Sequence, residues 1–472
     1  MKLRVGCVIV GFLALILSMS AQTFTTLHSF DGADGSSPGY GALVQATDGN
    51  LYGTTGTGGA NGSYGTVFKI TPSGTLTTVY SFCAKSRCTD GKYPAAGPVQ
   101  ATNGNFYGTT AQGGDNNGGT VFKITPSGKL TRLYSFCSQS GCTDGEYPQG
   151  GLIQATNGSL YGTTSGGGAS NAGTIFKITP SGTLTMLYTF CSQSGCTDGS
   201  APSLGLVQAA DGNFYGTTGG GGVNNAGTVF KITPGGALTT LYSFCSQSGC
   251  TDGELPEAGL VQASNGNFYG TTVQGGASGG YGTVFKITPS GTLTTLHSFD
   301  FDSADGSTPY AGLVQATNGS FYGTTVEGAV HGDGTVFKIT PSGTLTTLHS
   351  FDGTDGELAY AGLVQATNGN FYGVTEAGGA HSLGTVFSLS EGLGPFVEAQ
   401  PTSGKVGAAV KILGTNLTGA TGVTFNGTTA TFTVVSKSEI TTTVPTGATT
   451  GTVEVITPSG TLKSNSKFRV MP

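Results

Sequence analysis

The segment TFTTLHSF, Thr23–Phe30, is one copy of a motif that ends each repeat of this chain. Six later copies each come directly after a segment like GTVFKITPSG, and they begin at Thr75, Lys129, Thr183, Ala237, Thr292 and Thr344. The copy at Thr23 has no such segment before it. We therefore expect this orphan copy to complete a repeat whose other parts lie elsewhere in the sequence.

A Tyr-Gly pair marks the repeat and returns every 50 to 55 residues, at Tyr52, Tyr107, Tyr161, Tyr215, Tyr269, Tyr322 and Tyr372. Each of the seven units holds four short runs, of the form GLVQAT, NFYGTT, GTVFKIT and LTTLYSF, which we label a to d. In these runs β-branched and aromatic residues alternate with small polar ones, as strands require. No window sustains the 3.6-residue period of a helix, so the sequence predicts an all-β chain without helix.

The connections between the runs are of two lengths. TNGN or TDGN joins run a to run b, and TPSGT joins run c to run d; both are signals for tight turns. A glycine-rich loop joins b to c, and a longer loop joins d to the next a. Because antiparallel strands reverse direction at each connection, the sequence predicts the tight turns at one end of every sheet and the long loops at the other.

Seven antiparallel sheets of four strands predict a seven-bladed β-propeller over residues 22–391. The seventh unit ends after run c, so the N-terminal strand at residues 23–30 is predicted to close the propeller by completing the last blade. The alternative is an open solenoid, which would leave that first strand unpaired and an edge exposed. From residue 394 the repeat stops, and short alternating strands predict an immunoglobulin-like β-sandwich over residues 394–472.

Residues 1–21 have the pattern of a secretory signal peptide, because Lys2 and Arg4 precede the apolar run VIVGFLALIL and small residues follow it. We expect cleavage there, and we find no later segment long enough to span a membrane. The mature protein is expected to be a monomer that is secreted, periplasmic or attached to the cell surface. Charged residues make up only 9% of the chain and its net charge is −6, which argues against a nucleic-acid partner.

Two parts of the sequence resemble known families. The elements GLVQATNGNFYGTT, GTVFKITPSG and LTTLYSF resemble the GloVer tandem repeat of exported bacterial proteins of the choice-of-anchor type. The segments PTSGKVGAAVKILGTNL and TTTVPTGATTGTVEVITPSG resemble an IPT/TIG immunoglobulin-like domain. The resemblance implies a secreted bacterial protein, but it implies no particular activity, so function has to be argued from the site.

Eight cysteines of the predicted mature chain form four pairs with the same spacing, namely Cys83 and Cys88, Cys137 and Cys142, Cys191 and Cys196, and Cys245 and Cys250. A zinc site usually has shorter gaps together with histidine or further cysteines. In an exported chain four local disulfides are the better prediction. Each would stiffen one loop between runs d and a.

Three other d-to-a loops are acidic and become neighbours once the propeller closes. They carry Asp31, Asp34, Asp300, Asp302, Asp305, Asp352 and Asp355. The plainer hypothesis is that one Asp-Gly pair in each unit stabilises a turn. The other hypothesis is a Ca²⁺ site, because calcium prefers hard oxygen ligands, although no loop has the spacing of a known calcium motif.

The long-loop end is predicted to be the working surface, because only its loops are free to vary. Candidate ligand-binding residues there are Tyr40, Tyr310, Tyr360, Glu327, His331, Asp333, Glu376 and His381. The other histidines, His28, His297 and His349, stand where most units have tyrosine in run d, and a structural role is expected for them. One glutamine in each run a, from Gln45 to Gln365, is expected either to bond neighbouring blades together or to line the axial channel.

No GxSxG or HExxH motif supports catalysis. We therefore predict a non-enzymatic binding or cell-surface interaction protein whose partner is an extracellular glycan or a surface protein. The alternative is an extracellular polysaccharide-acting hydrolase or lyase with carboxylates in the acidic loops, since two carboxylates suffice for sugar chemistry.

Overall fold

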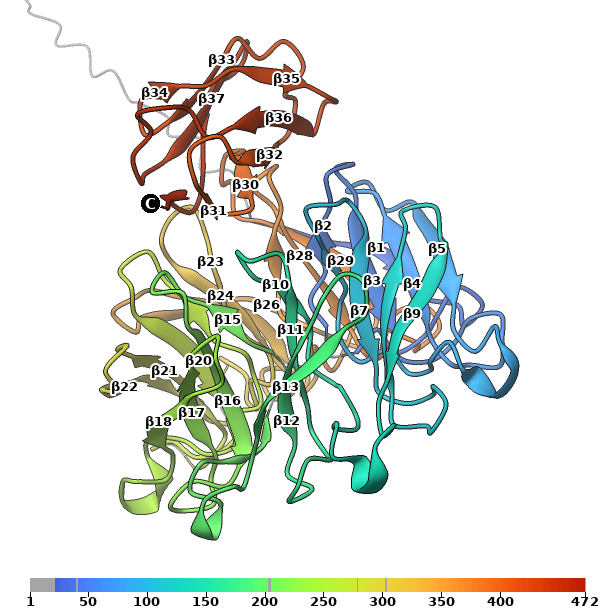
Figure 1. Ribbon diagram of the computed structural model, residues 1–472. Helices are drawn as coiled ribbons and strands as arrows, with labels where there is room; N and C mark the ends of the chain where they lie inside the picture. The colour runs from blue at the N-terminus through green and yellow to red at the C-terminus, as the bar shows by residue number, and fades with distance from the viewer. Residues whose placement is uncertain (1–21, 40, 203–204, 278, 302–303, 472) are drawn as a thin grey trace, which may run out of the picture.

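The computed structural model describes residues 22–39, 41–202, 205–277, 279–301, 304–471. The predicted signal peptide, Tyr40 and Asp302 lie outside the described residues. Figure 1 shows the repeats as sheets arranged around a centre in a propeller-like array, with a separate β-sandwich above one end.

The described part of the chain contains seven antiparallel repeat sheets, each with the predicted strand order a, b, c, d. The innermost strands are β2 (Val44–Gln45), β6 (Val99–Gln100), β10 (Ile153–Gln154), β15 (Val207–Gln208), β19 (Val261–Gln262), β23 (Val314–Gln315) and β27 (Val364–Gln365). The b strands are β3 (Leu51–Thr55), β7 (Phe106–Thr110), β11 (Leu160–Thr164), β16 (Phe214–Gly220), β20 (Phe268–Thr272), β24 (Phe321–Thr325) and β28 (Phe371–Thr375). We number the units one to seven from the sheet of β2 to the sheet of β27.

The outer two strands complete each sheet. The c strands are β4 (Thr66–Ile70), β8 (Thr120–Ile124), β12 (Thr174–Ile178), β17 (Thr228–Ile232), β21 (Thr283–Ile287), β25 (Thr335–Ile339) and β29 (Thr385–Ser390). The d strands are β5 (Leu76–Ser81), β9 (Leu130–Ser135), β13 (Leu184–Thr189), β18 (Leu238–Ser243), β22 (Leu293–Ser298), β26 (Leu345–Ser350) and β1 (Thr23–Ser29). Unit four also has β14 (Ser200–Pro202), which pairs with β16.

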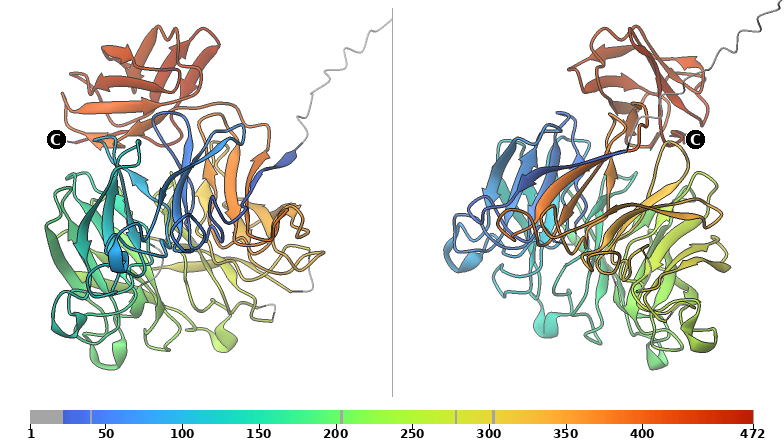
Figure 2. Two further views of the ribbon diagram at one scale, coloured as in Figure 1. Left: turned by 90° about the vertical axis from the view of Figure 1, so that its right-hand side faces the viewer. Right: turned by 180° about the vertical axis from the view of Figure 1, so that it is seen from behind.

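The orphan segment is the d strand of unit seven, as the sequence predicted. β1 pairs antiparallel with β29, from Thr23 opposite Ser390 to Ser29 opposite Thr385. The next residue, Phe30, donates its backbone N–H to the carbonyl of Gly384 over 3.0 Å. The first strand of the repeat region therefore joins the last sheet, and the views from the side and from behind show the blue and orange strands together (Figure 2).

Aromatic contacts between successive sheets build the core. Phe299 of one unit meets Phe337 of the next edge-to-face with ring centroids 5.4 Å apart, and Phe30 meets Phe68 in the same way at 5.3 Å. Strand b passes directly over the phenylalanine of strand c, and a Cβ on Gly270 would lie only 2.7 Å from Cζ of Phe285. The glycine of the Tyr-Gly pair is therefore set by packing, and the aromatic residues of each repeat pack together with buried Leu, Ile and Val.

The glutamines of strand a join neighbouring units, which confirms the first of the two predicted roles. Each side-chain carbonyl accepts a backbone N–H from the a-to-b turn of the preceding unit over 2.8–3.0 Å, in the pairs Gln45–Thr367, Gln100–Thr47, Gln154–Thr102, Gln208–Thr156, Gln262–Ala210, Gln315–Ser264 and Gln365–Thr317. These bonds satisfy amides that would otherwise be left without partners near the axis.

The prediction that the chain lacks helix is wrong for the cysteine loops. Among the described residues, short 3₁₀ turns occur at η1 (Ser86–Cys88), η2 (Ser140–Cys142), η3 (Ser194–Cys196) and η4 (Ser248–Cys250). Each fits within a single closed loop, too short to give a helical period in the sequence. Within the described ranges, no helix has the length and apolar character needed to cross a bilayer.

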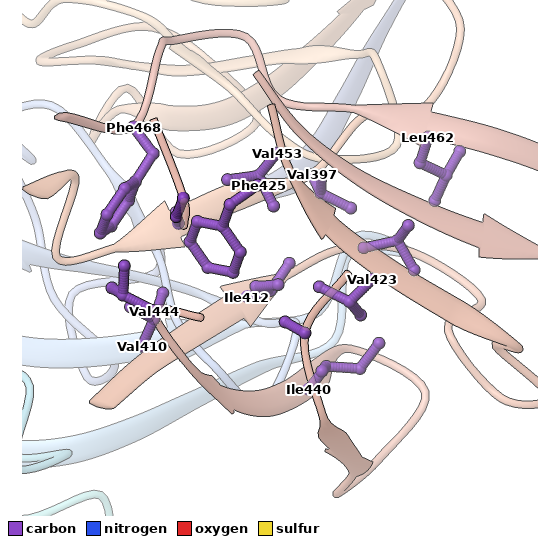
Figure 3. Close-up of a cluster of buried hydrophobic side chains, with 14 of the residues drawn as sticks. Val397, Val410, Ile412, Val423, Phe425, Ile440, Val444, Val453, Leu462 and Phe468 are labelled. Carbon is purple, nitrogen blue, oxygen red and sulfur yellow. The ribbon is translucent and has the colours of Figure 1, made fainter. Parts of the chain in front are cut away.

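The C-terminal region is a β-sandwich of two four-stranded sheets with a short parallel pair beside them. One sheet contains β30 (Glu398–Gln400), β32 (Ala409–Leu413), β36 (Glu439–Thr443) and β35 (Phe432–Val434). The other contains β34 (Thr428–Thr429), β33 (Gly422–Phe425), β37 (Val453–Thr457) and β38 (Gly460–Lys463), and the parallel pair is β31 (Ser403–Gly404) with β39 (Arg469–Val470). The two sheets enclose a core in which Phe425 and Phe468 meet edge-to-face at 5.0 Å (Figure 3).

The sandwich sits on the tight-turn end of the repeat array (Figures 1 and 2). Ser438 donates its hydroxyl to the Thr47 carbonyl over 2.8 Å, and Asn465 donates its side-chain N–H to the Gln315 carbonyl over 3.1 Å. Arg469 reaches the carbonyl of Ala210. These contacts fall on units one, six and four, so the C-terminal domain covers one end of the array and leaves the long-loop end uncovered.

Candidate functional site

The long-loop end contains two kinds of d-to-a loop, as the sequence predicted. Four loops of the described chain are closed by the disulfides Cys83–Cys88, Cys137–Cys142, Cys191–Cys196 and Cys245–Cys250, which confirms the predicted pairing. The other three loops are acidic. We call these two groups of loops the disulfide sector and the acidic sector. They share one structural device, in which a side chain of strand d binds the aspartate of the loop that follows.

In the disulfide loops this device is a tyrosine bound to a buried aspartate. Asp90 is completely buried and accepts the Tyr80 hydroxyl over 2.7 Å together with the backbone N–H groups of Ala84 and Lys85. Burial, together with this carboxylate, raises the pKa of Tyr80 well above its usual range. For Asp144, burial alone would raise the pKa, but hydrogen bonds from Ser138 and from the Tyr134 hydroxyl hold the pKa below its ordinary value.

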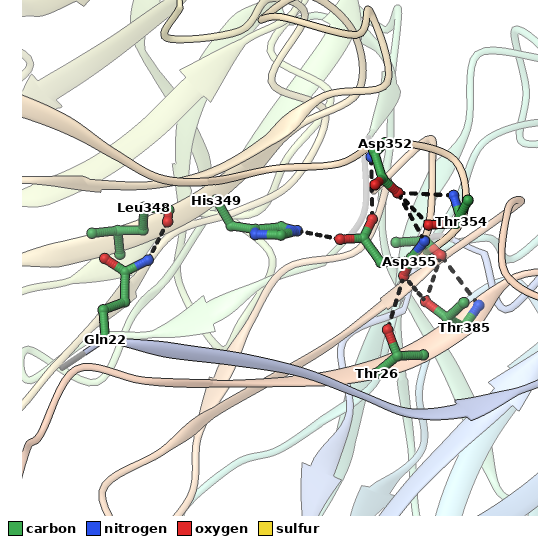
Figure 4. A network of polar contacts seen from close by, with 9 residues as sticks. Gln22, Thr26, Leu348, His349, Asp352, Thr354, Asp355 and Thr385 are labelled. Atoms are coloured by element: carbon green, nitrogen blue, oxygen red, sulfur yellow. Dashed lines mark hydrogen bonds and ion pairs between the residues drawn. The ribbon is translucent and has the colours of Figure 1, made fainter.

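In the acidic loops a histidine replaces that tyrosine. His28 Nε2 lies 2.6 Å from Asp34 Oδ2, and His349 Nε2 lies 2.7 Å from Asp355 Oδ2 (Figure 4). His297 and Asp305 repeat the contact at 2.6 Å. The geometry therefore agrees with a structural role for these histidines and gives one aspartate of each acidic loop a partner within its own sheet.

The sequence contained a signal for this pairing that was missed. The tyrosine lies ten residues before its aspartate in the disulfide loops, as in Tyr188 and Asp198. The histidine lies six residues before its aspartate at His28 and eight residues before it at His297. Residue type and loop length therefore change together, because the shorter loops place the carboxylate against the smaller ring.

Asp31 and Asp352 hold the turns of their own loops. Oδ1 of Asp31 accepts the backbone N–H groups of Ala33 and Asp34 over 2.9 and 3.1 Å. Oδ1 of Asp352 accepts the backbone N–H and the hydroxyl of Thr354 over 2.9 and 2.7 Å. The N–H of Asp34 lowers the pKa of Asp31, and the charge of His381 adds to this effect. This geometry fits the turn-stabilising hypothesis.

The aspartates predicted to bind Ca²⁺ do not gather around one point in the described part of the chain. The groups of three potential ligands found there are Cys137, Cys142 and Glu146, and Cys245, Cys250 and Glu254. All four of these cysteines are in disulfides, which removes them as thiolate ligands. Asp302 lies outside the described residues, and a calcium site in the acidic sector stays a prediction.

Two of the predicted ligand-binding tyrosines come together where the long loops approach the axis. Tyr310 and Tyr360, which lie just before the inner strands of units six and seven, are half-buried and meet edge-to-face with ring centroids 5.1 Å apart. Burial raises the pKa of Tyr310, and the negative charges of Glu257 and Glu327 raise it further. The result is an aromatic surface with carboxylates on its border.

Glu257 was missed in the sequence, although the repeat marks its position. It stands directly before Ala-Gly, where Tyr310 and Tyr360 stand in their own loops. A Cβ on Gly219 of the preceding unit would lie 2.6 Å from Glu257 Oε1, so the carboxylate lies against the backbone of the neighbouring sheet. Comparing loop positions between units would have identified it.

The other predicted residues do not join this cluster as one site. Glu376 is half-buried, and burial raises its pKa. His331 and His381 are exposed on their loops, and the Asp333 carbonyl accepts the N–H of Leu358 over 3.4 Å. The candidate site is therefore the pair Tyr310 and Tyr360 together with Glu257 and Glu327, whose charges act on Tyr310.

Comparison with known proteins supports the division into two regions. The model of the Gloeobacter/Verrucomicrobia repeat matches residues 14–197 and 192–387, and the model of the IPT/TIG domain matches residues 396–470. Among curated proteins, none matches this chain significantly.

Solved structures resemble the chain in fold. The extracellular domain of a hybrid two-component system from B. thetaiotaomicron is similar with a TM-score of 0.52 and 11% identity, over 94% of this chain and 54% of that one. The chain thus spans about half the length of that structure. A fungal alcohol oxidase in complex with copper has a TM-score of 0.48 and 13% identity, over 93% of this chain and 98% of that one. At 11% identity the likeness to the extracellular domain concerns the fold alone.

Proposed function

The chain belongs to the Gloeobacter/Verrucomicrobia repeat family, and we propose that it is an exported, non-enzymatic binding protein that uses the long-loop end of a closed seven-bladed β-propeller. In this proposal residues 22–391 form the propeller, the N-terminal strand closes it, and residues 394–472 form the immunoglobulin-like domain. Residues 1–21 would be removed on export. The four disulfides support a location outside the cytoplasm, in the medium, the periplasm or at the cell surface.

The contact between Tyr310 and Tyr360 carries the proposal. Their half-buried rings, 5.1 Å apart, present apolar surface and hydroxyl groups at the same place. Glu257 and Glu327 lie near enough to act on the charge state of Tyr310, and carboxylates are strong acceptors for sugar hydroxyl groups. An aromatic surface bordered by hydrogen-bond acceptors suits an extracellular glycan, neutral or carrying amino groups.

The position of the C-terminal sandwich adds a second argument. Its contacts with Thr47 and Gln315 occupy the opposite, tight-turn end. A large extracellular partner would therefore approach the long-loop end, where the loops also differ most between units. A protein partner on the same surface would use the same residues, and the experiment below separates the two classes.

The test is a glycan array followed by calorimetry with the best ligand. We expect Tyr310→Ala with Tyr360→Ala to weaken binding by about tenfold or more, since such aromatic side chains commonly dominate binding surfaces. The matched control is Tyr147→Ala, because Tyr147 is 38% exposed on a disulfide loop of the same end. Equal binding by all variants would reject this site, and an array without any hit would favour a protein partner.

Glu376 gives the enzymatic alternative one supporting observation. Burial raises the pKa of its carboxyl, as in acids that protonate a glycosidic oxygen. A turnover assay on extracellular polysaccharides tests this hydrolase or lyase hypothesis. Product that forms with the wild type and disappears with Glu376→Gln would replace the binding proposal with the enzymatic one.

The predicted calcium site is tested by calorimetric titration of the protein with Ca²⁺. Oδ1 of Asp31 and Oδ1 of Asp352 accept the turn hydrogen bonds, and the two side chains also interact with Asp34 and Asp355, so a bound cation would have to share these carboxylates with their turns. Saturable Ca²⁺ binding that is lost in Asp31→Asn with Asp352→Asn would establish the predicted metal site. Identical titrations would limit these aspartates to their turns.

A further inference from the structure

A cavity of about 850 Å³ lies between the C-terminal sandwich and the tight-turn end of the repeat array. Its repeat side is formed by the inner strands and a-to-b turns of units two to five, including Val99, Ile153 and Val207. Its sandwich side includes Glu398 and Arg469. The volume is that of a site for a small molecule, and the cavity is at the opposite end of the molecule from Tyr310.

The charge on Glu398 faces this cavity. Val397 and Ala399, its neighbours in and beside β30, belong to the sandwich core. Because side chains alternate along a strand, Glu398 points away from that core and towards the repeat array. Burial raises the pKa of its carboxyl. Glu398 is only partly exposed, and among the described residues no ion pair includes it, so its carboxyl group lies at the cavity without a cationic partner.

Positive charge lines the same cavity at a separate place. The Arg469 guanidinium donates to the Ala210 carbonyl, and the exposed Lys467 lies near it at the border of the cavity. In the described part of the chain Arg469 makes no ion pair with Glu398, so the two charges are more than 4.0 Å apart. The cavity therefore has the Glu398 carboxyl group and the Arg469 guanidinium on its wall without contact between them. This arrangement suits a ligand that carries one positive and one negative charge.

The repeat side contributes mainly apolar surface. The Gln154 amide is already engaged, because its oxygen accepts the Thr102 N–H and its nitrogen donates to the Gly158 carbonyl. Ile153 and Val207 are partly exposed and line the cavity beside these amides. The ligand would therefore place an apolar body against the repeats and its charged groups against the sandwich.

We propose that this cavity binds a small zwitterion with an aliphatic body, in the class of free amino acids. Its ammonium group would pair with Glu398, and its carboxylate would pair with Arg469 and Lys467. Its side chain would pack on Ile153 and Val207. Each group of the ligand then meets a partner that the protein already holds at the cavity wall, which is the arrangement that makes burial of charge favourable.

Calorimetry on the full mature chain tests the proposal with leucine, isoamylamine and isovalerate as probes. These share the branched aliphatic body and carry both charges, the ammonium alone or the carboxylate alone. We expect leucine to bind at least about tenfold more tightly than either single-charge probe. Isoamylamine binding as tightly as leucine would remove Arg469 and Lys467 from the site, and no leucine binding at millimolar concentration would overturn the proposal.

Variants separate this site from the long-loop end. Glu398→Gln should weaken leucine binding by about tenfold or more, and Arg469→Met should weaken leucine while leaving isoamylamine unchanged. The control Glu454→Gln removes a carboxylate of the same sandwich, whose partner Lys463 is 68% exposed, and should leave the affinity unchanged. Thermal unfolding checks that each variant is folded. Tyr310→Ala with Tyr360→Ala should also leave leucine binding intact, so the two sites can fail independently.

Discussion

The side-chain carbonyl of Gln45 accepts a hydrogen bond from the backbone N–H of Thr367 over 2.8 Å, although 322 residues separate them. The same contact joins consecutive units elsewhere, for example Gln100 with Thr47 at 2.9 Å. Unit one therefore meets unit seven as any unit meets its neighbour. An open solenoid would leave Gln45 and Thr367 far apart, so this pair argues against that alternative.

Deletion of residues 23–30 should destabilise the repeat region. The deletion exposes the edge of β29 and removes Phe30, whose side chain is completely buried. We expect a loss of at least about 3–5 kcal/mol, the usual effect of removing one buried Phe, together with aggregation through the new edge. Chemical unfolding and light scattering measure both effects. Thr25→Ala, an exposed change in the same strand, should shift stability by less than about 0.5 kcal/mol. A deletion variant as stable as the wild type would contradict closure by β1.

The strand order and the role of residues 23–30 could be predicted because each element of the repeat occurs many times in the sequence. The same repetition identified the cysteine pairs, which are local in sequence. The site was harder to predict, because the rings of Tyr310 and Tyr360 come from different loops and meet only after the sheets pack, while Glu257 acts on Tyr310 from a third loop by its charge. The cavity beside Glu398 could not be predicted at all, since it depends on how the sandwich sits on the array.

Tyr188→Phe should destabilise unit three by about 1–3 kcal/mol. The change removes the hydroxyl that donates to the completely buried Asp198 over 2.8 Å, while the N–H of Ser192 still donates at 2.9 Å. Loss of one donor to a buried carboxylate has a cost of that size. Urea unfolding measures it. The control Tyr147→Phe removes a hydroxyl that makes no hydrogen bond in the described chain and should be neutral; equal effects of both changes would deny Asp198 its structural role.

Asp211 should make the protein less stable in acid. Burial raises its pKa, but hydrogen bonds from Asn213, Lys231 and Tyr215 outweigh burial and lower the pKa to about 2. Because the folded pKa lies below the unfolded one, the contribution is complete above about pH 4 and disappears as the pH falls towards 2. The side chain is 40% exposed, so the effect is a modest fall in Tm.

Asp211→Asn tests this pH dependence without a change of shape. Unit five already has Asn265 at this position, where its amide donates to the Tyr269 hydroxyl over 3.1 Å. At pH 6 the variant should have a lower Tm than the wild type, because only the ionised aspartate adds stability. At pH 2.5 the difference in Tm should be smaller. A difference in Tm that stays constant between these two pH values would contradict the assignment.

Each disulfide and its neighbouring tyrosine should stabilise the loop by separate means. Cys191 and Cys196 close a short loop, and their replacement by serine should cost about 2 kcal/mol, mainly because the unfolded chain gains freedom. Tyr188 acts instead on the folded loop through Asp198. Residues of one loop commonly couple by about 0.5–3 kcal/mol, but these two contributions arise in different states of the protein, so we expect them to add.

A double-mutant cycle of Tyr188→Phe with Cys191→Ser and Cys196→Ser measures this additivity by urea unfolding. The loop should stay closed without its disulfide, because the N–H of Gly199 donates to the Cys196 carbonyl over 2.9 Å and Asp198 still accepts its own donors. Tyr188→Phe should then have its full effect in the serine background. If it has none there, the loop has already opened, and the disulfide, rather than the buried aspartate, is what holds the folded loop in place.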